Sequence, residues 1–271
     1  MIPIFPDKNV GPAAYTHLNM KGFQKLLVSS IFYTIQGEGP HAGRPAVFVR
    51  LAGCNLGDKT VCPWCDSSFE YDKGAVFSAS NLAARIRGHH DKTNLVVVTG
   101  GEPLLQWKAL FEVMQEVEAL NAKQYIWQFE TNGVLLHAEM IAQSRVANLD
   151  VFFVVSPKVI GGKYQPLTSA MIAAYETFAL KYIVSADPAS LYHTLPQEAH
   201  AVQAWVPVYI SGQTEYGPDD KLATPGHPIS LFGLSPLGQA QTAANYAHAA
   251  KLALKYGMRT SFQTHLLAGV E

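Results

Sequence analysis

Apolar stretches of strand length alternate with helical stretches along most of this 271-residue chain. Runs rich in β-branched and aromatic residues and bounded by turn residues predict strands. The predicted strands are Ala46–Leu51, Leu95–Thr99, Tyr125–Glu130, Val151–Val155, Leu180–Ser185, Ala204–Ile210 and Arg259–Thr264. The helical stretches are Ser78–Gly88, Pro103–Asn121, Ala138–Ala147, Ser169–Thr177 and Gln239–Tyr256, the last followed by Gly257 as a helix stop. Because most of these strands are continuously apolar, we expect an α/β fold with a parallel sheet under outer helices, closed as a barrel or open and doubly wound.

A single domain covering residues 1–271 is the expected organisation. At ~150 residues per domain the length corresponds to about 1.8 domains, and no stretch has the composition of an interdomain linker. We expect Met1–Lys21 to form a loosely attached arm. The polar, glycine- and proline-rich stretch Ser211–Pro228 predicts a long surface loop.

Charge and hydropathy argue against several classes of function. Lys and Arg number 20 against 21 Asp and Glu, and no dense basic run occurs, so binding to a phosphate backbone is not the expected activity. Apolar runs such as Val151–Val155 are far shorter than the ~20 residues that span a bilayer. The stretch Met1–Gly11 does not resemble a secretion signal. We therefore expect a cytoplasmic protein that acts on a small molecule and binds neither nucleic acid nor membrane.

Polar and glycine-bearing segments follow five of the predicted strands. They are Cys54, Gly100–Pro103, Thr131–Gly133, Ser156–Lys158 and His265. Ligand sites in parallel α/β folds lie beyond the carboxyl ends of the strands. We therefore expect these segments to converge on one rim.

The chain has only three cysteines, Cys54, Cys62 and Cys65, and they lie close together. This clustering favours metal or redox chemistry over a disulfide framework. Three thiolates at this spacing suit an iron-sulfur cluster with one iron open to a ligand from outside the protein. A zinc site is an equally good interpretation of the cysteines alone, with a fourth ligand from His41, His89 or His90.

The segment Gly100–Pro103 lies between a predicted strand and a predicted helix that opens with proline. Its glycines allow a close approach of the backbone to a ligand, and its carbonyls and Glu102 have the chemistry to hold an ammonium group. Taken alone, the segment is more typical of a tight strand-to-helix connection.

Together, these motifs resemble the radical S-adenosylmethionine (SAM) enzymes, in which three cysteines hold a 4Fe-4S cluster and SAM chelates the fourth iron. The resemblance is closer to the 7-carboxy-7-deazaguanine synthase family and runs from about Phe32 to the C-terminus. The segments that carry it are Gln36–Gly39, Arg50, Gly53–Asn55, Trp64–Asp66, Thr99–Pro103, Glu130–Gly133, Ser156–Lys158 and Gln263–His265.

The resemblance implies a homodimer of partial (β/α) barrels, each with about six parallel strands. It also implies a ring-contracting lyase that converts 6-carboxy-5,6,7,8-tetrahydropterin to 7-carboxy-7-deazaguanine with loss of ammonia, a step in queuosine biosynthesis. The implied cofactors are the 4Fe-4S cluster, SAM and Mg²⁺, and the implied electron donor is a flavodoxin-like protein.

The family's site residues carry over onto matching positions of this chain. Cys54, Cys62 and Cys65 would hold the cluster. The SAM site would contain Trp64, Cys65, Asp66, Gly101, Glu102, Ser156, Pro157, Lys158 and Ser235. The substrate site would contain Ile35, Gln36, Gly37, Glu38, Arg50, Thr99, His265 and the terminal Glu271, with Glu38, Arg50 and His265 as catalytic candidates. Arg50 suits a carboxylate, and Gln36 and Glu38 suit a pterin edge of alternating donors and acceptors.

Three positions depart from the family pattern. Ser67 stands where a threonine usually binds Mg²⁺, and its hydroxyl is also a suitable ligand. The gap between Cys54 and Cys62 is longer than the commonest arrangement. Ser235–Leu237 replaces a Gln-Pro-Met segment.

Two alternatives compete with this interpretation. One is another small radical SAM enzyme, such as a glycyl-radical activase, which would need an open active-site face for a partner protein. The other is a non-enzymatic, zinc-stabilised binding module.

Overall fold

The structure of the chain, a computed structural model, describes residues 25–56, 62, 65, 74–119, 124–168, 171, 175–216 and 230–268. The predicted arm Met1–Lys21 lies outside the described residues. So does most of the predicted helix Ser169–Thr177, apart from Met171 and the 3-10 turn η5 (Tyr175–Thr177). Every helix within the described ranges is too short or too polar to span a lipid bilayer.

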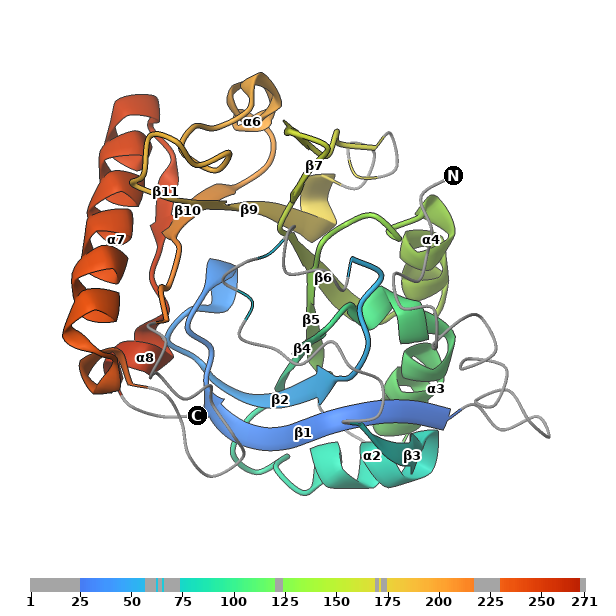
Figure 1. The fold of residues 1–271 in the computed structure, drawn as a ribbon. Coiled ribbons are helices and arrows are strands. Elements are labelled where there is room, and N and C mark those ends of the chain that lie inside the picture. The colour runs from blue at the N-terminus through green and yellow to red at the C-terminus, as the bar shows by residue number, and fades with distance from the viewer. Residues whose placement is uncertain are drawn as a thin grey trace.

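A curved sheet of nine strands forms the body of the protein, in the order β11-β10-β9-β6-β5-β4-β2-β1-β3. From β11 to β2 all neighbouring strands are parallel. These strands are β2 (Pro45–Leu51), β4 (Leu95–Gly100), β5 (Ile126–Thr131), β6 (Asp150–Val155), β9 (Phe178–Val184), β10 (Val208–Gly212) and β11 (Arg259–Ser261). Every predicted strand is confirmed, with ends that differ by a few residues. Figure 1 shows the sheet curling around an interior, as expected of a partial barrel.

Additional strands that the sequence analysis does not predict extend this sheet. β1 (Lys25–Ile35) pairs antiparallel with β2, and β3 (Ala75–Ser78) pairs antiparallel with β1. A separate hairpin consists of β7 (Val159–Ile160) and β8 (Lys163–Tyr164).

The loop after β1 contacts the far end of the barrel. It contains the 3-10 turn η2 (Gly39–His41), and the amide of Gly39 donates a hydrogen bond to Oγ of Ser261 in β11 at 3.4 Å. Oγ1 of Thr264, in α8 (Thr264–Ala268), donates to the carbonyl of Gly37 at 3.5 Å. Ile35 lies opposite Pro45, where β2 begins. The loop therefore crosses the interior of the barrel from the start of β2 to the end of β11 and forms its floor.

Helices cover the outer face of the sheet (Figure 1). They are α2 (Ala79–Arg87), α3 (Trp107–Glu118), α4 (Ala138–Val146), α6 (Gln197–Val202) and α7 (Pro236–Tyr256), with a short turn η6 (Leu231–Gly233) before α7. As predicted, α7 stops at Gly257, which has a φ of 68°. The predicted helix Pro103–Asn121 begins instead with a 3-10 turn, η4 (Pro103–Gln106), before α3.

Side chains alternate between the two faces of the barrel strands. In β5, Trp127 and Phe129 are buried in the main core, where Phe129 packs against Trp107 of α3. Gln128 and Glu130 occupy the opposite face and hydrogen-bond to each other at 2.7 Å. The apolar outer face binds the helices, and the inner face is free to carry polar side chains.

The predicted surface loop Ser211–Pro228 is wrong over its first residues. Ser211 and Gly212 belong to β10 and pair with Ile183 and Val184 of β9, while Gln213 and Thr214 are buried. Residues 217–228 lie outside the described part of the chain. The error arises because the polar side chains at this strand end face a cavity inside the barrel, whereas the prediction assumed that they face solvent.

Candidate active site

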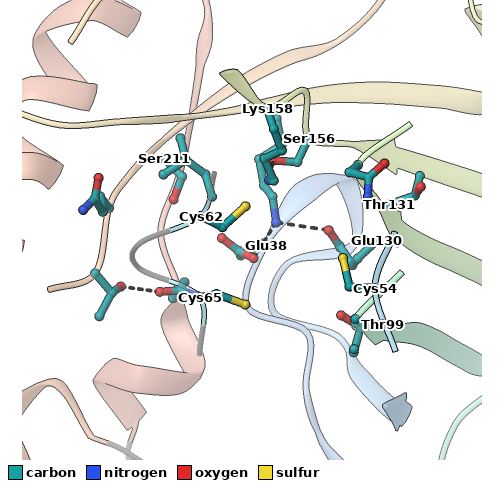
Figure 2. A pocket seen from close by; sticks show the side chains of 18 of the residues that line it. Glu38, Cys54, Cys62, Cys65, Thr99, Glu130, Thr131, Ser156, Lys158 and Ser211 are labelled. Carbon is teal, nitrogen blue, oxygen red and sulfur yellow. Dashed lines mark hydrogen bonds and ion pairs between the residues drawn. The ribbon is translucent and has the colours of Figure 1, made fainter. Parts of the chain in front are cut away.

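One cavity inside the barrel brings together most of the predicted site residues (Figure 2). Its lining includes Gln36, Glu38, Arg50, Cys54, Cys62, Cys65, Thr99, Gly101, Ser156, Lys158 and His265. These residues come from the floor loop, the strands and the loops beyond the strands' carboxyl ends. The predicted convergence is therefore confirmed for this set.

The three cysteines line the cavity beyond the carboxyl end of β2, and all are partly buried. The amide of Cys65 donates to the carbonyl of Cys62 at 3.0 Å, so this pair lies on a tight turn. Burial raises the pKa of Cys54 to about 12, against a hydrogen bond from the amide of Leu56 that lowers it. Metal binding at Cys54 must therefore release a proton from the thiol.

The histidines required by the zinc interpretation lie away from this cavity. The ring of His89 stacks on Tyr33 with centroids 5.6 Å apart, and Nδ1 of His90 lies 3.1 Å from the Tyr125 hydroxyl. His41 belongs to η2 at the floor, where burial lowers its pKa. None of these three histidines is among the residues that line the cavity with the cysteines. The proposed zinc ligand set is wrong, because its histidines lie at the amino ends of the strands.

The glycine pair at the end of β4, Gly100 and Gly101, holds the backbone that leads to Cys54. The amide of Gly101 donates to the carbonyl of Leu51 at 3.0 Å, and the amide of Glu102 donates to the carbonyl of Gly53 at 2.8 Å. A Cβ on Gly101 would collide with that Gly53 carbonyl. Glycine is required here because two backbone segments pack directly against each other.

Replacement of Gly101 by alanine tests this packing. We expect Gly101→Ala to lower the free energy of unfolding by about 1–3 kcal/mol, because the methyl group pushes the two loops apart. Urea unfolding of the metal-free protein measures the change. Gly233→Ala is the control, since its added Cβ meets only Ser230 Cβ, at 3.9 Å. Equal effects of the two substitutions would contradict the role of Gly101.

Glu102 lies behind the cavity wall and not among its lining residues. Its side chain is fully buried, and its oxygens accept hydrogen bonds from the amides of Leu104 and Asn132 and from Oγ1 of Thr131. Burial raises its pKa, against these hydrogen bonds. Asn132 in turn donates to Oδ1 of Asn55 at 2.7 Å, next to Cys54. Glu102 therefore supports the cysteine loop, and its carboxylate has no open face toward a cofactor.

The segment after β6 contributes a lysine to the cavity wall. Nζ of Lys158 donates to Oγ of Ser156 at 2.7 Å, and the amide of Lys158 donates to Oε1 of Gln165 at 3.0 Å. Pro157, between them, is buried and does not line the cavity. Ser156 and Lys158 thus offer a hydroxyl and an ammonium group to a bound molecule.

Arg50 lies in β2 on the inner face of the barrel, beside Thr99 of β4. Its guanidinium group lies 5.6 Å from the centroid of the Phe32 ring. Its Nε is buried and makes no hydrogen bond within the described part of the chain. A buried guanidinium donor of this kind suits a ligand carboxylate.

His265 lines the cavity from α8 and packs against the backbone of Gly37. A Cβ on Gly37 would collide with the imidazole ring, so glycine leaves room for it. Gly37 and Ile35 themselves do not line the cavity; Ile35 ends β1 opposite Pro45. Their contribution is to the shape of the floor.

Other predicted positions fall outside this cavity or outside the described residues. Ser235 caps the start of α7, where its Oγ accepts a hydrogen bond from the amide of Gly238 at 3.2 Å, and it does not line the cavity. The positions outside the described part of the chain are Trp64, Asp66, Ser67 and Glu271.

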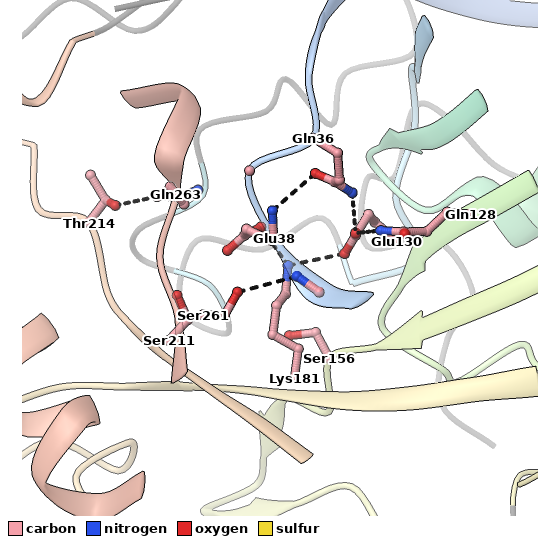
Figure 3. Close-up of polar contacts among 12 residues, drawn as sticks. Gln36, Glu38, Gln128, Glu130, Ser156, Lys181, Ser211, Thr214, Ser261 and Gln263 are labelled. Carbon is pink, nitrogen blue, oxygen red and sulfur yellow. Dashed lines mark hydrogen bonds and ion pairs between the residues drawn. The ribbon is translucent and has the colours of Figure 1, made fainter. Parts of the chain in front are cut away.

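Lys181 is a cavity residue that the sequence analysis misses. It lies in the middle of β9, and its Nζ forms ion pairs with Glu38 at 2.7 Å and Glu130 at 3.1 Å (Figure 3). Burial lowers its pKa, but the two carboxylates outweigh burial and raise the pKa above its usual value. The available signal was a lysine inside the apolar run Phe178–Val184, where a buried charge needs a partner.

Comparisons with known proteins agree with this geometry. A model of the Radical SAM superfamily matches residues 49–157, which include the three cysteines. The 7-carboxy-7-deazaguanine synthase of Rickettsia prowazekii is 32% identical over 253 residues, covering 91% of this chain and 89% of that protein. The synthase of Rhodospirillum rubrum is 32% identical over 252 residues, covering 89% of this chain and 91% of that protein.

Among solved structures, the crystal structure of QueE from Escherichia coli has the same fold. The match has a TM-score of 0.53 at 20% sequence identity and covers 91% of this chain and 96% of that one. The sequence similarity extends over nearly the whole chain. The three cysteines that line the cavity agree with the same family assignment. The chain belongs to the 7-carboxy-7-deazaguanine synthase family of radical SAM proteins.

Proposed function

We propose that this chain is a radical SAM lyase that converts 6-carboxy-5,6,7,8-tetrahydropterin to 7-carboxy-7-deazaguanine with loss of ammonia. The observation that carries the proposal is the division of one cavity into two chemically different ends. Cysteines line the end beyond the strands' carboxyl termini, and Gln36, Glu38 and Lys181 line the floor. Such a cavity suits a redox cofactor above and a small polar substrate below.

The cysteine end has the donors that a 4Fe-4S cluster and SAM require. Cys54, Cys62 and Cys65 would hold the cluster, since three thiolates leave one iron for SAM. Gly101, Ser156 and Lys158 would contact SAM, together with Trp64 and Asp66. Ser67 would be a ligand of Mg²⁺. When bound, the cluster and SAM supply a carbon radical that takes a hydrogen atom from the substrate.

Arg50, near the carboxyl end of β2, and the floor have the groups to fix the substrate's orientation. Arg50 would pair with the pterin carboxylate, and its buried Nε supplies one of the required donors. Glu38 would accept hydrogen bonds from the amino-bearing edge of the ring. Thr99, His265 and the terminal Glu271 would complete the substrate site. A substrate held at both its carboxylate and its opposite edge has one orientation toward the cofactor.

A product assay tests the proposal. Anaerobically purified, reduced protein is incubated with SAM, Mg²⁺ and 6-carboxy-5,6,7,8-tetrahydropterin, and we expect 7-carboxy-7-deazaguanine by mass spectrometry. Protein without SAM is the control. Cleavage of SAM without a deazaguanine product would contradict the proposal and favour a radical enzyme of another kind, such as a glycyl-radical activase.

The cellular setting is also part of the proposal. We expect one domain, a homodimer, a flavodoxin-like electron donor and a cytoplasmic location. Supporting the location, Cys54, Cys62 and Cys65 line one cavity as the expected cluster ligands, and a reducing compartment keeps thiolates available for that role. Sedimentation of the anaerobic protein measures the oligomeric state.

A further inference from the structure

We infer that Lys181 is a positioning residue that orients the Glu38 carboxylate to receive the N–H donors of the substrate's amino-bearing ring edge. The inference rests on the proposed function, and it adds a residue that neither the motifs nor the family pattern assign. The observation behind it is a buried network that joins the floor loop to β5 and β9 (Figure 3).

Lys181 ties together side chains from three separate elements. Its Nζ donates to Oε2 of Glu38 in the floor loop at 2.7 Å and to Oε2 of Glu130 in β5 at 3.1 Å. The three side chains are nearly buried, with exposed fractions of 8%, 15% and 14% for Lys181, Glu38 and Glu130. Ion pairs this far from solvent are screened little, so they fix the geometry of the groups that they join.

Glu130 and Gln36 are committed to contacts within the protein. Oε1 of Glu130 accepts from Nε2 of Gln36 at 3.2 Å and from Nε2 of Gln128 at 2.7 Å. Oε1 of Gln36 accepts from the amide of Glu38 at 3.2 Å. These contacts hold the floor loop against β5. Gln36, which lines the cavity, therefore also supports Glu38 from within the protein.

Glu38 is the member of the network with an acceptor to spare. Lys181 donates to Oε2 of Glu38, and none of the described residues donates a hydrogen bond to Oε1. The side chain of Glu38 lines the cavity. Glu38 also has the shorter of the two ion pairs to Lys181. Lys181 thus fixes one oxygen of this carboxylate and leaves the other for a ligand.

The charge of the network favours a ligand edge that presents N–H groups. One ammonium and two carboxylates give the network a net charge of −1. Tyr246 of α7 also interacts electrostatically with Glu38 and Lys181. It adds no charge, because burial raises its pKa to about 12. Without Lys181, the two neighbouring carboxylates would repel each other with no cation between them. Lysine therefore holds Glu38 beside Glu130 as well as orienting it.

Substitution of Lys181 in the holoenzyme tests this role. We expect Lys181→Met to raise KM for 6-carboxy-5,6,7,8-tetrahydropterin by about 10- to 100-fold, with the affinity for SAM within about twofold of wild type. The double variant Lys181→Met/Glu130→Gln removes one charge of each sign and restores the net charge of −1. We expect it to recover at least about fivefold of the lost substrate affinity, because Glu38 then has no carboxylate of like charge beside it. Lys251→Met, an exposed lysine of α7, is the control.

Each result of this experiment has a defined meaning. A Lys181→Met enzyme with wild-type KM overturns the inference, as does a double variant that binds substrate no better than the single variant. If circular dichroism shows that Lys181→Met does not fold, the double variant Lys181→Met/Glu130→Gln is used for the test. A substrate affinity of this double variant more than about 100-fold below wild type overturns the inference. A wild-type enzyme that makes no deazaguanine refutes the proposed function instead.

Discussion

Cys62→Ala is expected to abolish cluster assembly and reduce product formation to the level of a reaction without protein, while the chain remains folded. Without Cys62, only two thiolates remain, and two irons of a cubane cluster would then have no protein ligand. The fold is expected to persist because Cys62 is only partly buried and lies outside the main hydrophobic core. Iron and sulfide analysis with a visible absorption spectrum measures the cluster, and circular dichroism measures the fold.

Ser80→Ala, an exposed position in α2, serves as the control for handling and loading. We expect this control to take up iron and sulfide like the wild type. A Cys62→Ala protein that retains full iron and sulfide would remove Cys62 from the ligand set. A variant that loses its circular dichroism signal would show instead that the metal supports the fold.

The parallel part of the fold was predictable because each of its strands is an apolar run bounded by turn residues. Val96–Val98 and Val151–Val155 are examples, since strands covered on their outer face by helices need little polar alternation. β1 was not predictable in the same way. It contains the pair Ser29–Ser30 and a bulge between Val28 and Ser30, so its pattern does not follow a simple period of two.

The cysteine end of the site was more predictable than the floor. Cys54, Gly101 and Ser156 lie within a few residues of strand ends, and the topology alone places such residues on one rim. The floor depends on contacts between elements far apart in sequence, such as Lys181 with Glu38, which no local pattern encodes. Glu102 shows the opposite error, because a motif residue assigned to a cofactor is instead bonded to Leu104, Thr131 and Asn132.

Arg50→Ala is expected to weaken substrate binding by about 2–3 kcal/mol, or roughly 30- to 150-fold, and to leave SAM binding within about twofold of wild type. The reason is that Arg50 occupies the inner face of β2, where its guanidinium packs near Phe32 and its buried Nε has no partner among the described residues. Loss of this side chain removes the cation expected to hold the pterin carboxylate. Titrations of the holoenzyme with 6-carboxy-5,6,7,8-tetrahydropterin and with SAM measure the two affinities separately.

Two further variants separate charge from geometry at this position. Arg50→Lys keeps the charge but lacks the planar fork of donors, so we expect it to recover only part of the lost affinity. Arg44→Ala removes a cation at the opposite, amino end of β2, where Arg44 contacts His41 and Asn94, and should leave both affinities near wild type. Equal losses of substrate and SAM affinity in Arg50→Ala would contradict the assignment, because they would mean that Arg50 shapes the whole cavity. A selective loss that lysine only partly repairs would identify Arg50 as the carboxylate clamp, since charge alone cannot replace two aligned donors.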